Sequence, residues 1–187
     1  MWDLLIPLML TIVVLPMAVR LAIYSCGFAG YEWYSPDDVL TDFYCYYKSY
    51  LLDIIGIFAG IVLAFRLVLY REKTRNMRIF IPLALYCVFA ILSTILSVNA
   101  DASLKGNFES FESILVLIVY VVFSLYAYQI MENERDYKYI WYSILIITAL
   151  FTVIGTFQIF GHDLLNYKWA QRLIMTGKQF TEYAGQL

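Results

Sequence analysis

The chain has 187 residues, of which 62% are hydrophobic and 15% are charged, and its formal net charge is −2. Soluble domains have about 25% charged residues and do not bury such a large share of apolar side chains, which excludes a water-soluble globular protein. A nucleic-acid-binding module is excluded as well, because the Lys and Arg residues form no basic stripe.

Five apolar stretches are long enough to cross a bilayer as helices. A hydrocarbon layer of ~30 Å takes about 20 residues, and within lipid each backbone polar group must find its partner inside its own segment. The predicted spans are residues 4–24, 51–70, 79–98, 114–131 and 140–160. The predicted fold is therefore an all-α integral membrane protein. A transmembrane region with short loops covers residues 1–165, and an interfacial outer tail covers residues 166–187.

The charges of the short loops predict the orientation, because Lys and Arg near span ends stay in the cytoplasm. Residues 71–78 contain four basic side chains, whereas residues 25–50 contain four acidic side chains and one Lys. We therefore expect a cytoplasmic N-terminus in a multi-pass protein of the cell membrane. Residues 25–50, 99–113 and 161–187 then lie outside. The first stretch has no basic region before it, so we interpret it as an uncleaved span and not as a signal peptide.

The outer segment 25–50 contains a helix-start signal and a group of aromatic residues. Ser35 is a hydroxyl N-cap followed by Pro36 and two acids, which predicts a helix that continues into the second span. We interpret the tyrosines that follow as headgroup anchors, with carbohydrate stacking as the alternative. These are Tyr44, Tyr46, Tyr47 and Tyr50. Cys26 and Cys45 are interpreted as free thiols in preference to a disulfide.

Two ionisable residues, Arg20 and Asp53, lie at similar depth near the outer ends of the first two spans. A charge at that depth must be paired or must reach water. We expect a structural ion pair between them, and the alternative is a site for an anionic headgroup or a pyrophosphate. In the second span, Gly56, Gly60 and Ala64 recur at every fourth position and predict a face on which another helix packs closely.

The chain has few residues that could bind a metal ion. His162 is the only histidine, and no spacing of Cys and His resembles a metal site. We therefore expect no metal ion and no cofactor.

The loop before the fourth span contains a recognisable pattern. It resembles the motif D-x-x-x-A-x-x-G-x-Y-E-R-x-E-G of bacterial O-antigen ligase and polymerase family proteins, which also precedes an apolar span. The positions that fit are Gly106, Phe108, Glu109, Phe111 and Glu112. Ser110 and Ser113 depart from the motif, because the family usually has Arg and Gly there.

A second pattern closes the fifth span. It is similar to the ending G-x-F-Q-x-x-G-x-D of the same family. The matching residues are Gly155, Phe157, Gln158, Gly161 and Asp163. The two motifs occur in the family's order and spacing and together cover about residues 95–165, so the resemblance covers the middle of the chain.

The resemblance implies a polytopic enzyme that transfers glycan from an undecaprenyl-pyrophosphate carrier to an acceptor at the outer membrane face, without a metal. The family's catalytic Arg and His residues lie in a large outer loop beyond the fifth span. This chain is thus expected to be an N-terminal portion without the catalytic groups, with membrane lipid and a polyprenyl-linked glycan as its partners. The rival hypothesis is a non-enzymatic membrane module, such as a transporter fragment or an assembly subunit.

Four residues are the sequence-based candidates for substrate binding: Arg20, Glu109, Glu112 and Gln158. Glu109 and Glu112 share one face if their segment is helical, where they either accept sugar hydroxyls or favour the helix start. Gln158 either binds substrate or forms a hydrogen bond to another helix. Asp53, Gly56, Gly60, Gly106 and Gly161 are assigned structural roles.

Overall fold

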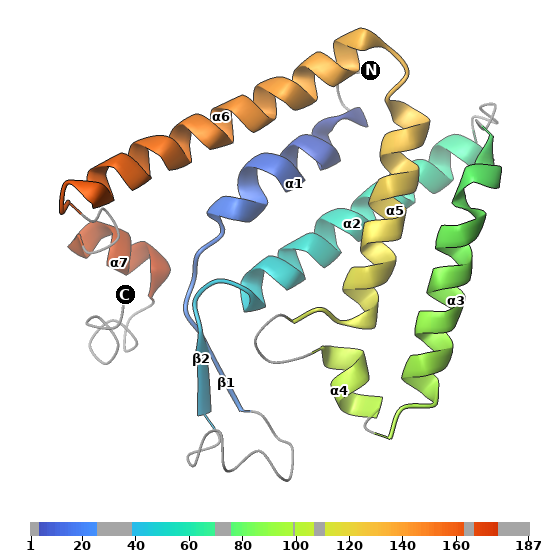
Figure 1. Ribbon diagram of the computed structural model, residues 1–187, viewed down its shortest axis with the longest axis horizontal. Helices are drawn as coiled ribbons and strands as arrows, with labels where there is room; N and C mark the ends of the chain where they lie inside the picture. The colour runs from blue at the N-terminus through green and yellow to red at the C-terminus, as the bar shows by residue number, and fades with distance from the viewer. Residues whose placement is uncertain are drawn as a thin grey trace.

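The computed structural model describes residues 4–25, 39–69, 76–98, 100–106, 111–162 and 167–175 (Figure 1). Most of these residues are helical, and one short two-stranded sheet is present. In chain order the elements are α1 (Ile6–Met17), β1 (Ala22–Ser25), β2 (Val39–Asp42), α2 (Tyr46–Val68), a 3₁₀ turn (Met77–Phe80), α3 (Ile81–Ile95), α4 (Ala100–Lys105), α5 (Ile114–Ile130), α6 (Glu134–Ile159) and α7 (Lys168–Ile174).

Three helical segments are long and apolar enough to cross a membrane. They are Tyr46–Val68 with 23 residues, Met77–Ile95 with 19 and Glu134–Ile159 with 26. Two further apolar helices, Ile6–Met17 and Ile114–Ile130, are shorter. The predicted class of a mostly helical membrane protein agrees with these elements.

The predicted continuous helix over residues 4–24 is wrong. Pro16 has no N–H with which to continue the helix ladder, and α1 ends one residue later at Met17. The chain then becomes extended, and β1 pairs antiparallel with β2, with Ala22 opposite Asp42. The sheet is not predicted from the sequence, because β1 lies inside an apolar run that reads equally well as a helix. The other strand, β2, lies where the signal at Ser35 and Pro36 predicts a helix.

The second predicted span begins differently from the expectation. The strand β2 occupies residues 39–42, so no helix runs through them into α2; Ser35 and Pro36 lie outside the described residues. The Asp42 carboxylate accepts the N–H groups of Tyr44 at 2.8 Å and Cys45 at 2.6 Å. It also accepts the Tyr46 N–H at 3.2 Å, and in this way it satisfies free donors at the start of α2.

The last predicted span is longer than expected. The helix α6 begins at Glu134, inside the predicted cytoplasmic loop, because Asn133 and Asp136 form a capping box. The Asp136 carboxylate accepts the Asn133 N–H at 3.1 Å. Polar residues at this helix end are therefore part of the helix and not of a loop.

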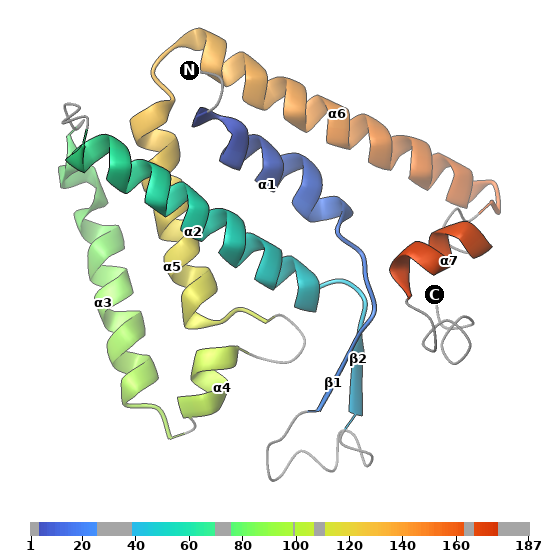
Figure 2. The same cartoon turned by 180° about the vertical axis from the view of Figure 1, so that it is seen from behind.

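The helices pack in a simple order. Figures 1 and 2 show α6 beside α1, and α2 between α1 and α5, and α3 packs on the other side of α5. The main core cluster is formed by Leu5, Leu8, Ala59, Tyr126 and Ile130, and the Tyr126 hydroxyl donates to the Leu4 carbonyl at 2.6 Å. By contrast, no residue of α3 is buried. Apolar faces that are left uncovered in this way are suited to contact with lipid tails.

The close approach of α2 and α5 depends on glycine. A Cβ atom added at Gly56 would lie 2.8 Å from Val119 Cγ2, whereas one added at Gly60 would lie 3.5 Å from Val122 Cγ1. The first distance is too short for a real contact and the second is ordinary. The small-residue face of α2 therefore meets α5 most tightly at Gly56.

The described part of the tail is a docked helix. The Leu21 N–H donates to the Ile174 carbonyl at 3.0 Å, and Leu21, Ile174 and Met175 form a buried cluster. On the opposite side of α7, Trp169 and Leu173 are 61% and 72% exposed. Both lie in the tail that the sequence predicts to be interfacial, and their exposure is compatible with that prediction.

Candidate functional site

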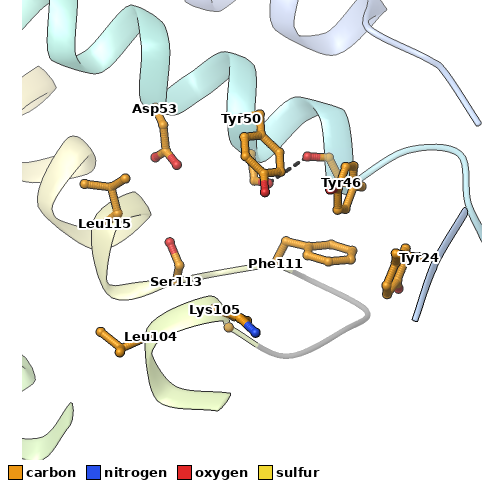
Figure 3. Close-up of a pocket in the computed structure, with 11 residues that line it drawn as sticks. Tyr24, Tyr46, Tyr50, Asp53, Leu104, Lys105, Phe111, Ser113 and Leu115 are labelled. Atoms are coloured by element: carbon orange, nitrogen blue, oxygen red, sulfur yellow. Dashed lines mark hydrogen bonds between the residues drawn. The ribbon is translucent and has the colours of Figure 1, made fainter. Parts of the chain in front are cut away.

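The ends of several elements meet at one end of the molecule. Figures 1 and 2 show the ends of α1 and α3 and the starts of α2 and α5 on this side, together with α4 and the sheet. A pocket of about 390 Å³ lies here, between the first turns of α2, the strand β1 and the connection from α4 to α5 (Figure 3). Its volume is in the range of small-molecule sites.

One side of the pocket is aromatic. Tyr24 of β1 stacks on Tyr46 of α2 with ring centroids 5.5 Å apart, and Phe111 meets both rings edge-on at 5.2 Å. Tyr50, one turn further along α2, lies 5.0 Å from the Tyr46 ring. Four rings from three separate segments thus form one wall.

Phe111 is held in an unusual backbone conformation. Its φ is +52°, in the left-handed region that costs a non-glycine residue about 1–2 kcal/mol. The ring contacts with Tyr24 and Tyr46 fix the side chain in this place. Strain of this kind occurs where the surroundings determine one geometry, and ligand sites are a frequent setting.

The polar residues of the pocket come from opposite walls. Ser49 and Asp53 belong to α2, whereas Lys105 and Ser113 belong to the end of α4 and the start of α5. Ser49 Oγ donates to the Tyr46 carbonyl at 2.8 Å, and Ser113 Oγ accepts the Val116 N–H at 3.2 Å. These two hydroxyls therefore already have partners within their own helices.

Asp53 differs from the other polar residues in the pocket. Its Oδ1 atom is buried and has no hydrogen-bond partner among the residues described by the structure. Figure 3 shows its carboxylate pointing from α2 toward Ser113. A buried carboxylate oxygen without a donor destabilises a protein, so it is a natural place for a ligand to supply one.

Gly106 shapes the lower wall of the pocket. Its φ is +83°, and a Cβ atom there would lie 2.7–2.8 Å from backbone atoms of Glu112 and Ser113. Only glycine lets the chain after α4 pass this close to the start of α5. The backbone at Glu112 is thereby held beside the pocket, while its side chain is exposed.

The predicted Arg20 and Asp53 ion pair is wrong. Arg20 is exposed in the extended segment after α1, and its guanidinium lies 5.2 Å from the centroid of the Tyr47 ring. It does not line the pocket that contains Asp53. The prediction failed because it placed Arg20 in a helix that ends three residues before it.

The other predicted substrate-binding residues do not converge. Glu112 adjoins the pocket through its backbone, and Glu109 lies outside the described residues. Gln158 is near the end of α6, which Figure 1 shows beside α7, and it is not among the residues that line the pocket. A single site made of Arg20, Glu112 and Gln158 is therefore not formed.

Gly161 ends α6 in a Schellman motif. Its φ is +79°, its N–H donates to the Gln158 carbonyl at 3.0 Å, and the His162 N–H donates to the Phe157 carbonyl at 2.9 Å. Both bonds satisfy carbonyls of the last turn. The second sequence motif therefore has a local structural role, because its Gly161 ends the long helix α6.

From the sequence, Tyr46 and Tyr50 are expected to be headgroup anchors, with carbohydrate stacking as the alternative, and neither is a candidate site residue. A signal was available, because Tyr46, Tyr50 and Asp53 recur at positions i, i+4 and i+7 and share one face of α2. Tyr24 and Phe111 gave no such signal, since they reach the pocket only through the sheet and the turn before α5. In the described part of the chain, no three His, Cys, Asp or Glu side chains gather in a way that suits a metal ion.

Comparison with known proteins identifies no relatives. No protein-family model matches the chain, and neither a curated protein nor a solved structure is similar to it.

Proposed function

We propose that the chain is the N-terminal membrane portion of a bacterial surface-polysaccharide ligase or polymerase, and that its pocket binds the glycan of a polyprenyl-pyrophosphate carrier at the outer membrane face. The proposal is supported by one observation: residues of the family-like loop motif form part of the pocket wall. Gly106 and Phe111, two residues of the loop motif, line the same pocket as Tyr46, Tyr50 and Asp53. The loop that resembles the family thus contributes directly to this pocket.

The pocket has the chemistry that a sugar ligand needs. Aromatic faces provide apolar surface for a sugar ring, and the Tyr50 ring is part of that wall. The carboxylate of Asp53 can accept hydrogen bonds from the ligand. Lys105, on the opposite wall, provides a positive charge that favours a phosphate group in the same ligand.

The proposal concerns binding and not the transfer step. Transfer requires a base for the acceptor hydroxyl and a cationic group for the leaving pyrophosphate. Arg20 does not line the pocket, and its guanidinium lies over Tyr47. We therefore assign the transfer chemistry to groups other than the residues of this pocket.

Five membrane crossings are part of the proposal. With 17 residues, α5 reaches the lower length limit for a span. α1 has only 12 residues, but the extended chain after it includes Leu21, which is 1% exposed. Extended backbone can remain at membrane depth where other protein segments cover it. In the proposed orientation the N-terminus is cytoplasmic and the pocket faces outward.

Cysteine labelling tests this orientation. In a variant with Cys26→Ser and Cys87→Ser, a membrane-impermeant maleimide is expected to label Cys45 in intact cells. Burial and the nearby Asp42 carboxylate raise the pKa of the Cys45 thiol, although Lys48 opposes them. Because the thiolate is the reactive form, labelling is expected to accelerate as the pH rises above neutral.

The control places a thiol at the opposite end. The same variant with Cys45→Ser and Glu132→Cys has its only thiol at an exposed position before α6. Labelling of this thiol is expected only after the membrane has been permeabilised. Labelling of Glu132→Cys in intact cells, with Cys45 protected, would reverse the orientation and move the pocket to the cytoplasmic face.

Deletion of the gene tests the function. Cells without the protein are expected to accumulate lipid-linked repeat units and to lose long surface glycan, and the intact gene is expected to restore both. The measurements are the length distribution of surface glycan and the amount of the lipid-linked pool. An unchanged lipid-linked pool would favour the non-enzymatic module and would contradict the proposal.

A further inference from the structure

Within the described part of the chain, the carboxylate of Asp53 lacks a hydrogen-bond donor at one of its two oxygens. Its Oδ1 atom is buried and has no hydrogen-bond partner among the described residues. Asp53 lies seven residues after the start of α2, which is about 10 Å along the helix. A charge at this depth of a membrane-spanning helix is stabilised best by an opposite charge, because a neutral donor compensates only part of the lost hydration.

The surroundings of Asp53 suit a cation. Tyr50 precedes it by one turn on the same face of α2, and both residues line the pocket. The face of a tyrosine ring attracts a positive charge, and this attraction strengthens where water is excluded. Tyr46 and Phe111 extend the aromatic wall beyond Tyr50. An aromatic wall beside a carboxylate is an arrangement that recognises ammonium groups.

Lys105 limits which cation can bind. It lies at the end of α4, on the wall opposite Asp53, and its side chain is a positively charged group of the pocket wall. A ligand that is only cationic would be repelled from that side. A ligand that carries an ammonium group and a phosphate group would match both walls.

We propose that the pocket binds a ligand through a primary ammonium group, which sits between the Asp53 carboxylate and the Tyr50 ring. Two kinds of molecule contain this group together with a phosphate. One is the carrier-linked glycan, if it includes an amino sugar, and the other is an ethanolamine phospholipid, through its headgroup. The amino-sugar form rests on the proposed function, whereas the headgroup form does not.

The sugar test uses the purified full chain in phosphatidylglycerol nanodiscs. The 1-phosphates of glucosamine and N-acetylglucosamine, which contain the phosphate group as well as the free or acetylated amine, are titrated calorimetrically at mildly acidic pH, where the free amine is protonated. The wild type is expected to bind the glucosamine phosphate about 10- to 100-fold more tightly, because acetylation removes the charge-assisted hydrogen bond. Asp53→Asn is expected to abolish this preference and Tyr50→Phe to retain it, since phenylalanine keeps the ring.

The lipid test uses nanodiscs with equal amounts of phosphatidylethanolamine and phosphatidylglycerol. The lipids that remain on the protein after extraction into detergent are counted by mass spectrometry. Wild type and Tyr50→Phe are expected to retain the ethanolamine lipid preferentially, and Asp53→Asn is expected to show no preference. Lys105→Gln is expected to weaken retention, because it removes the charge that favours the phosphate.

The two tests separate the outcomes. A preference in either test supports the ammonium site and identifies its source, and a preference in the lipid test alone would count against the proposed glycan function. Tight binding of the N-acetylglucosamine phosphate, equal to that of the glucosamine phosphate, together with no lipid preference would overturn the ammonium site and leave the proposed function standing. These comparisons are made within the wild-type protein, so they hold even if a variant fails to fold.

Discussion

Gly106→Ala is expected to lower the free energy of unfolding by roughly 2–5 kcal/mol. Two costs combine at this position. A non-glycine residue at a φ of +83° costs about 1–2 kcal/mol, and an atom forced into a packed region costs a further ~1–3 kcal/mol. The added Cβ would lie 2.7–2.8 Å from backbone atoms of Glu112 and Ser113, which cannot turn aside as a flexible side chain can.

Gly161→Ala is the matched control for this variant. Gly161 has a similar φ of +79°, but a Cβ atom there would meet nothing within 4 Å. Its substitution therefore isolates the backbone cost of about 1–2 kcal/mol. The measurement is thermal unfolding of both purified variants in the same detergent, and equal losses would show that Gly106 does not pack against the start of α5.

Because Gly106 shapes the pocket wall, its substitution is also expected to weaken ligand binding in any variant that remains folded. Gly161→Ala is expected to leave binding unchanged, since Gly161 lies at the end of α6 and not at the pocket. Titration of both variants with the ligand identified for the wild type separates loss of the pocket from general loss of stability.

Gly56→Ala is expected to destabilise the protein by about 1–3 kcal/mol, even though alanine favours helices more than glycine does. The added Cβ would lie 2.8 Å from Val119 Cγ2 and 3.0 Å from Val119 Cβ. Val119 is buried at 2% exposure, and its branched side chain has few alternative rotamers. The helices α2 and α5 would have to move apart.

The same substitution one turn later is expected to have the opposite sign. At Gly60 a Cβ atom would lie 3.5 Å from Val122 Cγ1, an ordinary contact, so Gly60→Ala is expected to be neutral or to stabilise by up to ~1 kcal/mol. Thermal unfolding in detergent again provides the measurement. A loss at Gly60 as large as that at Gly56 would contradict the described packing of the two helices.

A second substitution tests the origin of the Gly56 effect. In the double variant Gly56→Ala and Val119→Ala, the clashing methyl groups are absent, so the combined loss is expected to be smaller than the sum of the two single losses. Additive losses would mean that Gly56 acts through something other than its contact with Val119.

The overall composition and the length of the apolar runs were sufficient to predict the helical membrane class, because lipid requires every spanning segment to satisfy its own backbone hydrogen bonds. Apolar runs near residues 51–70 and 140–160 became parts of α2 and α6, and residues 114–131 became α5 almost without change. The small-residue spacing predicted a packing face on α2 for the same reason, since helical periodicity is a local property. It did not reveal that Gly56 is the position of closest approach.

The pocket, in contrast, depends on contacts between segments that are distant in sequence. After the first helix has ended, the pairing of residues 22–25 with 39–42 brings Tyr24 to Tyr46. The left-handed Phe111 and the glycine at 106 then placed the start of α5 against α2. Neither the strand pairing nor the position of α5 has a strong local signature in the sequence. Both are stabilised by hydrogen bonds and ring contacts between segments that are distant in sequence, and these contacts form only in the folded protein.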